Sequence, residues 1–160
     1  MALGIPLLLG AALATAEFCA EPFNGGVGEP QFCRITQRQE ISTPYFSMFV
    51  EPDFIAGIHH EGNRIQVQST LWQSPNELSI ERIEGSEPPA WPDCTKITET
   101  VEQGVTWQDC QISTDGLYQR RLSTRLKDAF VVIEYSYTLR GAETGPALER
   151  MTQSVRVHAI

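Results

Sequence analysis

The sequence predicts an α+β fold, a twisted antiparallel β-sheet on which a C-terminal amphipathic helix and one short additional helix pack. Two observations support this class. Most of the chain from Phe32 to Leu139 consists of short strand-like segments that follow one another and are separated by turn residues. Near the C-terminus, apolar residues recur at three- and four-residue spacing, which predicts an amphipathic helix. A series of strands followed by a helix favours an antiparallel sheet covered by helices.

Residues 1–16 have the pattern of a secretory signal peptide. They carry no charged side chain and end in Ala14-Thr15-Ala16, a small-residue cleavage site. The apolar run is shorter than the roughly 20 residues that a membrane-spanning helix needs. We therefore expect no stable membrane insertion, a periplasmic or secreted location, and a single mature domain over residues 17–160.

All four cysteines, Cys19, Cys33, Cys94 and Cys110, lie in the expected mature chain. An even number in an exported protein predicts two disulfides. Of the three possible connectivities we favour Cys19–Cys33 and Cys94–Cys110, because they close the smallest loops. No CxxC, zinc-type Cys/His cluster or haem motif is present, so the sequence predicts no cofactor.

The first half of the domain begins with a Gly- and Pro-rich stretch, and a loop-like start is expected over residues 17–31. A short strand over 32–41 and an aromatic core strand over 45–50 should follow. The clearest hairpin joins Phe54–His59 through Glu61-Gly62-Asn63 to a strand in which apolar and polar residues alternate from Arg64 to Leu71.

Two readings compete for residues 74–83. Ser74-Pro75-Asn76-Glu77 has the form of a capping box, which predicts the short additional helix, ended by Gly85. The competing reading is a strand through Leu78 and Ile80. Residues 86–93 contain three prolines and should form an exposed loop, with Trp91 folded back onto the domain.

The second half reads as strands joined by tight turns and then a helix. Strands are expected over 96–101, 105–112, 117–126 and 129–139, the last being the strongest β segment and the expected central strand. Pro146 then opens the amphipathic helix, in which Leu148, Met151, Thr152 and Val155 recur at helical spacing.

The order of elements resembles that of PsbP-like domains. The stretch Thr43-Pro44-Tyr45-Phe46-Ser47-Met48-Phe49-Val50-Glu51-Pro52 with the hairpin after it is similar to the opening of those domains. The strand 129–139, a polar loop and a terminal helix ending in Ser154-Val155-Arg156-Val157 are similar to their close. The two disulfides and the proline-rich insert depart from the pattern.

This resemblance implies a non-enzymatic scaffold. The superfamily includes photosystem II assembly subunits, Ran-binding factors and bacterial periplasmic proteins, some of which are immunity proteins against type VI secretion effectors. No binding motif can be carried over residue by residue. The sequence also contains no nucleophile elbow or other catalytic motif, so we expect no enzyme activity.

The formal net charge of −8 argues against nucleic acid and anionic membranes as partners. It fits either a basic protein partner or a surface that is acidic for solubility. Another protein is therefore the expected partner, of unknown identity.

Few residues are candidates for a site. Arg121 and Arg125 would share one face of a strand and could meet an acidic partner, or form an ordinary wet face. Trp91, if exposed in its loop, is the first candidate interface residue. His59 and His60 are weak metal candidates, because adjacent strand residues point to opposite faces, and solvated turn histidines are the simpler reading.

Three functional hypotheses follow. The first is an exported, non-catalytic protein-interaction module, such as a periplasmic immunity or assembly factor. The second is a periplasmic module that binds a small ligand or lipid between sheet and helix. The third is a metal-dependent hydrolase centred on His59 or His60.

Overall fold

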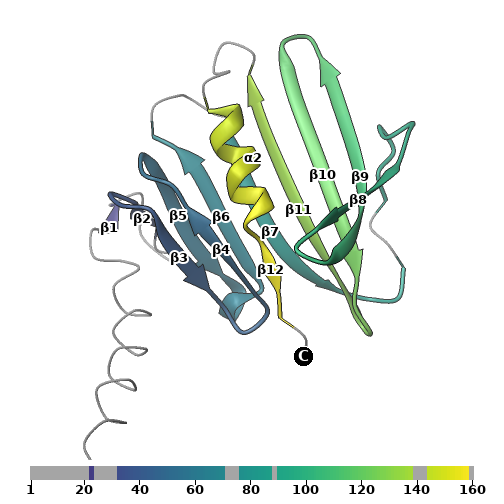
Figure 1. Ribbon diagram of the computed structural model, residues 1–160, viewed down its shortest axis with the longest axis horizontal. Helices are drawn as coiled ribbons and strands as arrows, with labels where there is room; N and C mark the ends of the chain where they lie inside the picture. The colour runs from purple at the N-terminus through teal and green to yellow at the C-terminus, as the bar shows by residue number, and fades with distance from the viewer. Residues whose placement is uncertain (1–21, 24–31, 71–75, 88–89, 139–143, 159–160) are drawn as a thin grey trace, which may run out of the picture.

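The computed structural model describes residues 22–23, 32–70, 76–87, 90–138 and 144–158. A nine-stranded sheet in the order β1-β2-β5-β6-β7-β11-β10-β9-β8 forms most of this structure, and all of its neighbouring strands are antiparallel (Figure 1). Its strands are β1 (Pro22–Phe23), β2 (Phe32–Arg34), β5 (Phe54–His59), β6 (Arg64–Ser69), β7 (Glu77–Glu84), β8 (Thr98–Glu102), β9 (Val105–Thr114), β10 (Leu117–Arg125) and β11 (Ala129–Thr138).

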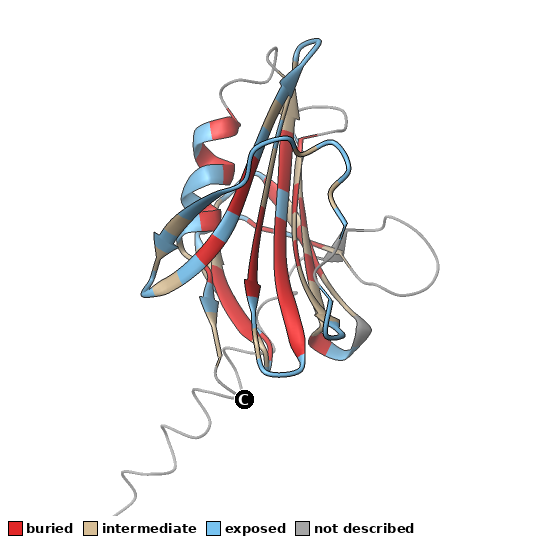
Figure 2. Ribbon diagram, turned by 90° about the vertical axis from the view of Figure 1, so that its right-hand side faces the viewer, coloured by how far each residue is buried: buried red, intermediate tan, exposed pale blue. Residues whose placement is uncertain are grey.

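A second layer covers one face of this sheet. It consists of the helix α2 (Gly145–Gln153) and a three-stranded sheet in the order β12-β4-β3, made of β3 (Gln39–Ser42), β4 (Phe46–Val50) and β12 (Arg156–Val157). With the large sheet seen nearly edge-on, α2 lies on one side of it (Figure 2). We call the face under α2 the inner face and the opposite one the outer face.

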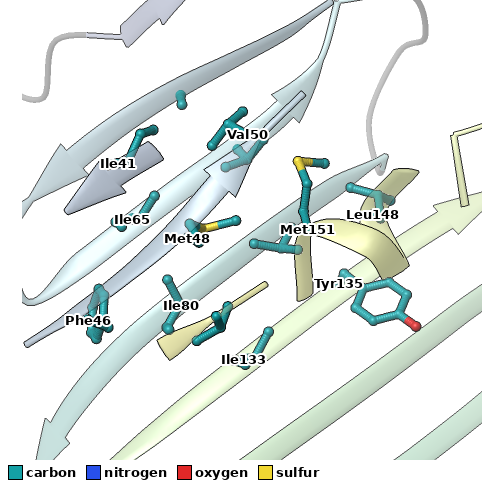
Figure 3. Packing of buried hydrophobic residues seen from close by; sticks show 14 of the residues in the cluster. Ile41, Phe46, Met48, Val50, Ile65, Ile80, Ile133, Tyr135, Leu148 and Met151 are labelled. Carbon is teal, nitrogen blue, oxygen red and sulfur yellow. The ribbon is translucent and has the colours of Figure 1, made fainter. Parts of the chain in front are cut away.

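The hydrophobic core lies between these two layers. Alternate residues of the large sheet, such as Ile65, Ile80 and Ile133, point from the inner face toward Met48 of β4 and Met151 of α2 (Figure 3). Each of these five side chains is at most 1% exposed. Burial of this apolar surface is the main driving force that holds the layers together.

The hairpins follow the sequence signals. Glu61 and Gly62 lie in a 3-10 turn, η1 (His60–Gly62), between β5 and β6. The β9–β10 connection is a two-residue turn at Asp115-Gly116, and both residues have positive φ, 45° and 80°. Such turns match the twist of the flanking strands, and glycine adopts this backbone conformation without a steric penalty. The predicted hairpins are thus confirmed.

The predicted α+β class with two helices is wrong. The described residues are mainly antiparallel sheet, and α2 is the only α-helix among them; it ends at Gln153, before Val155. The short helix predicted over 74–83 is instead the strand β7, which pairs with β6 on one side and β11 on the other. Leu78 and Ile80, two positions apart, are both fully buried on the inner face. Pairing on both sides therefore outweighs the local helix-start signal, of which Ser74 and Pro75 lie outside the described residues.

Several other expectations can be compared with the structure. β11 lies inside the sheet, between β7 and β10, as expected for the strongest β segment. Within the predicted loop-like start, Pro22 and Phe23 pair with Cys33 and Phe32, so a strand replaces part of the loop. The predicted signal peptide, residues 1–16, lies outside the described residues. In the part of the chain that is described, no helix is long and apolar enough to cross a membrane.

Candidate binding groove

The outer face of the large sheet carries a polar row that runs across five strands. Gln66, Ser79, Glu134, Arg121 and Cys110 lie directly opposite one another on β6, β7, β11, β10 and β9. Side chains at directly opposite positions share a face of the sheet. These residues point away from the core, because their neighbours along each strand supply the buried inner-face side chains.

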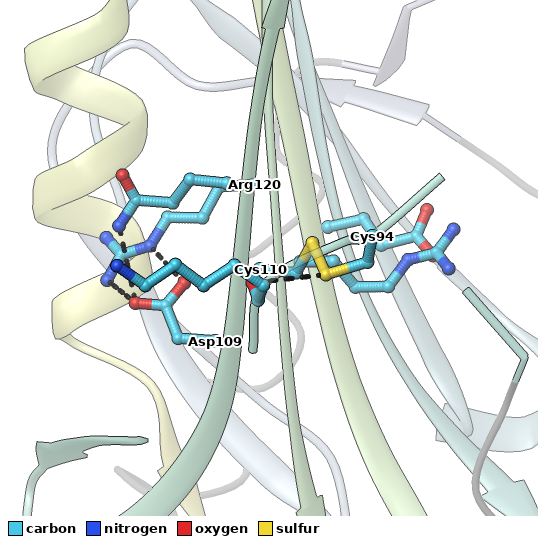
Figure 4. Close-up of a disulfide and its surroundings, with 8 residues drawn as sticks. Cys94, Asp109, Cys110 and Arg120 are labelled. Atoms are coloured by element: carbon cyan, nitrogen blue, oxygen red, sulfur yellow. Dashed lines mark hydrogen bonds and ion pairs between the residues drawn. A yellow bond between two sulfur atoms is a disulfide. The ribbon is translucent and has the colours of Figure 1, made fainter. Parts of the chain in front are cut away.

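A disulfide ties a loop to the end of this row. Residues 90–97, which we call the Trp91 loop, contain neither strand nor helix. Cys94 is bonded to Cys110, as predicted, and this bond lies on the opposite side of the sheet from Arg120 and Asp109 (Figure 4). Cys33 is also disulfide-bonded. Its predicted partner Cys19 lies outside the described residues.

Trp91 folds back onto the sheet, as predicted. The guanidinium carbon of Arg121 lies 5.0 Å from the centroid of the Trp91 ring, within the range of a cation–π contact. The same Arg121 forms an ion pair with Glu134, with 2.6 Å between Nε and Oε1. The aromatic ring is therefore fixed above a charged pair of the outer face.

Between the Trp91 loop and the outer face lies a groove of about 400 Å³. This volume falls within the range of about 300–1,000 Å³ that is typical of ligand sites. Its lining is mixed in charge and mostly polar: Arg64, Gln66, Glu77, Ser79, Ala90, Trp91, Pro92, Asp93, Cys94, Cys110, Ile112, Gln119, Arg121, Glu134 and Ser136. Leu78, Arg120 and Tyr135 also border it, although their strand positions direct their side chains to the inner face.

Two buried donors in this lining have no hydrogen-bond partner. They are Nε of Arg64 and the indole Nε1 of Trp91. Arg64 also takes part in none of the ion pairs among the described residues. Buried N–H groups are paired in the great majority of folded structures, so unpaired donors beside a groove indicate a site for an acceptor.

The three residues predicted as an interface have different positions. Trp91 and Arg121 lie together in the groove. Arg125 lies on the same face of β10, but it is opposite Phe130, and its guanidinium carbon is 5.9 Å from that ring centroid. Arg125 is therefore not part of the groove lining, whereas Arg64 is, and the sequence analysis did not single it out.

The structure places the two histidines that were weak metal candidates at the end of β5 and in the turn after it. His59 ends β5, and its ring packs edge-on against Phe32 at 5.6 Å between centroids. His60 begins the 3-10 turn that follows. Among the residues that the structure describes, no group of three or more His, Cys, Asp or Glu could hold a metal ion.

A second polar cluster, on the inner face, was missed by the sequence analysis. Arg120 donates two hydrogen bonds to Asp109, 3.0 Å from Nε to Oδ1 and 2.8 Å from an Nη to Oδ2. It also donates to the hydroxyl of Tyr135, and Thr100 donates to Asp109. The signal was available: Arg120 and Arg121 are adjacent on a strand, so one of them had to face the core and find a carboxylate.

The electrostatics of this cluster follow from its pairing. Burial acts to raise the pKa of Asp109, but the hydrogen bonds and charge of Arg120 outweigh it and hold that pKa below its ordinary value. The hydrogen bond to Asp109 raises the pKa of Arg120. Burial raises the pKa of Tyr118 and that of Tyr135. The cluster is thus a fixed ion pair surrounded by neutral phenols, which fastens β9, β10 and β11 together.

Comparison with known proteins gives a likeness in structure alone. No protein-family model matches the sequence, and no curated protein matches it. The solution structure of cyanobacterial PsbP from Synechocystis sp. PCC 6803 is similar with a TM-score of 0.54 and 12% identity, over 85% of this chain and 98% of that one. A crystal structure from Bacteroides thetaiotaomicron has a TM-score of 0.44 and 10% identity, over 78% of this chain and 49% of that one, which is too distant to identify a fold.

The likeness to cyanobacterial PsbP supports the fold part of the predicted resemblance. At 12% identity this likeness shows how the chain folds and does not assign it to a family or a function. The chain has a PsbP-like fold, with the Trp91 loop and its disulfide placed on the outer face of the large sheet.

Proposed function

We propose that the protein is an exported, non-catalytic accessory module that binds another protein through the groove under the Trp91 loop. The observation that carries the proposal is the pair of buried, unpartnered donors, Arg64 Nε and Trp91 Nε1, in the lining of this groove. Aromatic and arginine side chains are also the residue types most enriched where binding energy concentrates in protein interfaces.

Export is supported by the cysteines. Cys94 and Cys110 are bonded, and Cys33 is bonded as well. Disulfides persist in oxidising compartments such as the periplasm and the cell exterior. This agrees with the signal-peptide pattern of residues 1–16.

A non-catalytic role is supported by the pairing of Arg121 in the groove and of the inner-face groups whose pKa values are shifted. In the groove, Arg121 is held by Glu134 and by the Trp91 ring. Asp109, whose pKa is lowered by Arg120, and Tyr135, whose pKa is raised by burial, lie on the inner face and are hydrogen-bonded to Arg120. General acid–base chemistry needs a titratable group that is free to exchange a proton with a substrate.

Site-specific photo-crosslinking in the producing cells tests this proposal. A benzophenone amino acid at Gln119, which is exposed and lines the groove, should crosslink to a protein partner. The matched position is Glu149, exposed on α2 in the layer that covers the inner face, where no adduct is expected.

The captured protein must then bind the purified chain and lose that binding in the Arg64→Met and Trp91→Phe variants. Equal crosslinking from Gln119 and Glu149, or none from either, would overturn the proposal. An adduct whose mass shows a small molecule instead of a protein would favour the ligand-binding alternative, since the groove volume also suits a small ligand.

A further inference from the structure

From the chemistry of the groove lining we infer that the bound part of the partner is an extended peptide segment with a basic side chain, held largely through its backbone. This inference rests on the proposed function and adds the class of ligand. It follows from three features of the groove: its unpaired donors, its unpaired carboxylates and its length.

The donors require oxygen acceptors at two separate places. Arg64 belongs to β6, and Trp91 belongs to the loop that is tied to β9, so the two lie on different parts of the lining. A buried N–H that loses water without gaining a partner costs about 1–3 kcal/mol. Successive carbonyl groups of a peptide backbone can reach both donors, whereas one compact ligand atom cannot.

The carboxylates exclude a strongly anionic ligand. Glu77, Asp93 and Glu134 line the groove, against the guanidinium groups of Arg64 and Arg121. Glu134 is neutralised by Arg121, while Glu77 and Asp93 form none of the ion pairs among the described residues. A phosphate or sulfate would therefore enter a groove whose lining includes two unpaired carboxylates. The ammonium or guanidinium group of a peptide side chain can instead pair with these carboxylates, while a neighbouring backbone carbonyl accepts a hydrogen bond from the donors.

The net charge of the chain favours the same partner. The formal net charge is −8, so a basic segment is attracted over a longer range than the groove itself. The exposed carboxylate of Asp93, at the rim next to Trp91, offers a first contact for a lysine or arginine.

The polar row sets the length of the peptide. From Gln66 to Arg121 it crosses three intervals between neighbouring strands, about 14 Å in all. An extended chain covers about 3.3–3.6 Å per residue, so roughly four residues fit along the row. The side chains of Ser79 and Gln66 supply further neutral hydrogen-bonding groups beneath such a segment.

NMR titration of the purified full chain with defined peptides tests the inference. The main peptide is a blocked alanine pentapeptide with a central lysine; the matched peptide carries glutamate instead. The reporter is the indole N–H signal of Trp91, which should move downfield when it donates to a carbonyl. We expect the lysine peptide to bind with a Kd of about 1 mM or tighter, and the glutamate peptide to bind at least about tenfold more weakly.

Three variants link the binding to the proposed contacts. Trp91→Phe removes the indole N–H and keeps an aromatic ring, and Arg64→Met removes the guanidinium donors. Each should weaken binding of the lysine peptide by about 3- to 10-fold, the usual effect of one hydrogen bond. Arg125→Met is the matched control, since Arg125 is exposed on the same face of β10 outside the groove, and it should change binding less than about twofold.

The remaining outcomes each overturn a defined statement. If acetate or inorganic phosphate alone moves the Trp91 indole signal as far as the peptide does, the groove is an anion site and the inference is wrong. If the glutamate peptide binds equally well, the basic side chain is wrong. If neither peptide binds while Gln119 still crosslinks to a partner protein, the peptide inference fails and the proposed function stands.

Discussion

The guanidinium carbon of Arg121 lies 5.0 Å from the centroid of the Trp91 ring. Arg121 is also directly opposite Cys110 in the pairing of β10 with β9, and Cys110 holds the same loop by its bond to Cys94. The Trp91 loop is thus attached at two neighbouring positions of one cross-strand row, by a covalent bond and by a ring contact. The shape of the groove should depend on both attachments.

Replacing both cysteines, Cys94→Ser with Cys110→Ser, should lower the free energy of unfolding by about 3 kcal/mol, because the bond closes a loop with a sequence separation of 16. Urea denaturation measures this loss. Faster exchange of the Trp91 indole N–H with solvent should accompany it.

The double variant is a better test than a reducing agent, which would also break the disulfide of Cys33. An unchanged exchange rate of the indole N–H would show that Arg121 alone keeps the loop closed.

Arg121→Gln separates groove order from overall stability. The ion pair with Glu134 is partly exposed, with side-chain exposures of 34% for Arg121 and 47% for Glu134. Such pairs contribute about 0–1 kcal/mol to folding, so the melting temperature should change little. The Trp91 ring should nevertheless lose its position, as seen in the chemical shifts of residues 90–94. Arg125→Gln is the matched change and should leave those shifts in place; a large loss of stability in Arg121→Gln would contradict this account.

Asp109→Ala should be strongly destabilising, by about 3–5 kcal/mol, because it leaves Arg120 charged and unpaired at the inner face. The side chains of Asp109 and Arg120 are only 2% and 11% exposed. Chemical denaturation of the single variants and of Asp109→Ala with Arg120→Met measures the coupling between the two residues. The double variant should recover much of the loss, and additive losses would mean that the two residues contribute independently.

How far the sequence predicts this structure depends on the range of the signals. Local signals gave correct predictions. Thr114-Asp115-Gly116 predicted a turn, and the structure has it at Asp115-Gly116; the alternation after Arg64 predicted a half-buried strand; and the small loop between Cys94 and Cys110 predicted their bond. The helix prediction for the segment through Leu78 was wrong, because pairing with β6 and β11 decides its conformation and β11 lies far away along the chain.

The candidate site shows the same division. Trp91 could be singled out because prolines surround it, and Arg121 because it lies in a basic cluster. Arg64 could not, since its place in the groove results from the pairing of β6 with β7 and the position of a loop more than twenty residues later. The bond between Arg120 and Asp109 depends on the register of β10 against β9, which alternation alone does not specify.

The ion pair of Asp109 also predicts a pH dependence of stability. The folded pKa of Asp109 lies below its ordinary value of 3.8, so the folded state binds this proton more weakly than the unfolded state does. Its contribution is fully present above that ordinary value and is lost as the pH falls through the folded pKa. The difference in unfolding free energy between the wild type and Asp109→Asn should therefore be largest near neutral pH and shrink below about pH 4. Urea denaturation of both proteins over this range measures it, and a difference that stayed constant would show that Asp109 keeps its ordinary pKa.

Gly145→Ala tests the contact between the start of α2 and the large sheet. A Cβ at this position would lie 2.7 Å from Cζ of Tyr137, closer than real Cβ atoms approach other heavy atoms. Alanine improves intrinsic helix propensity by at most about 1 kcal/mol over glycine, and less at the first residue of a helix. Overpacking costs about 1–3 kcal/mol, so the substitution should destabilise the protein.

Tyr137 cannot move freely, because its ring packs on that of Tyr118 at 5.0 Å between centroids. Thermal unfolding measures the effect, Gln153→Ala at the exposed end of the same helix is the control, and adding Tyr137→Val should relieve the clash. A Gly145→Ala protein as stable as the wild type would mean that the Tyr137 ring turns aside at no cost.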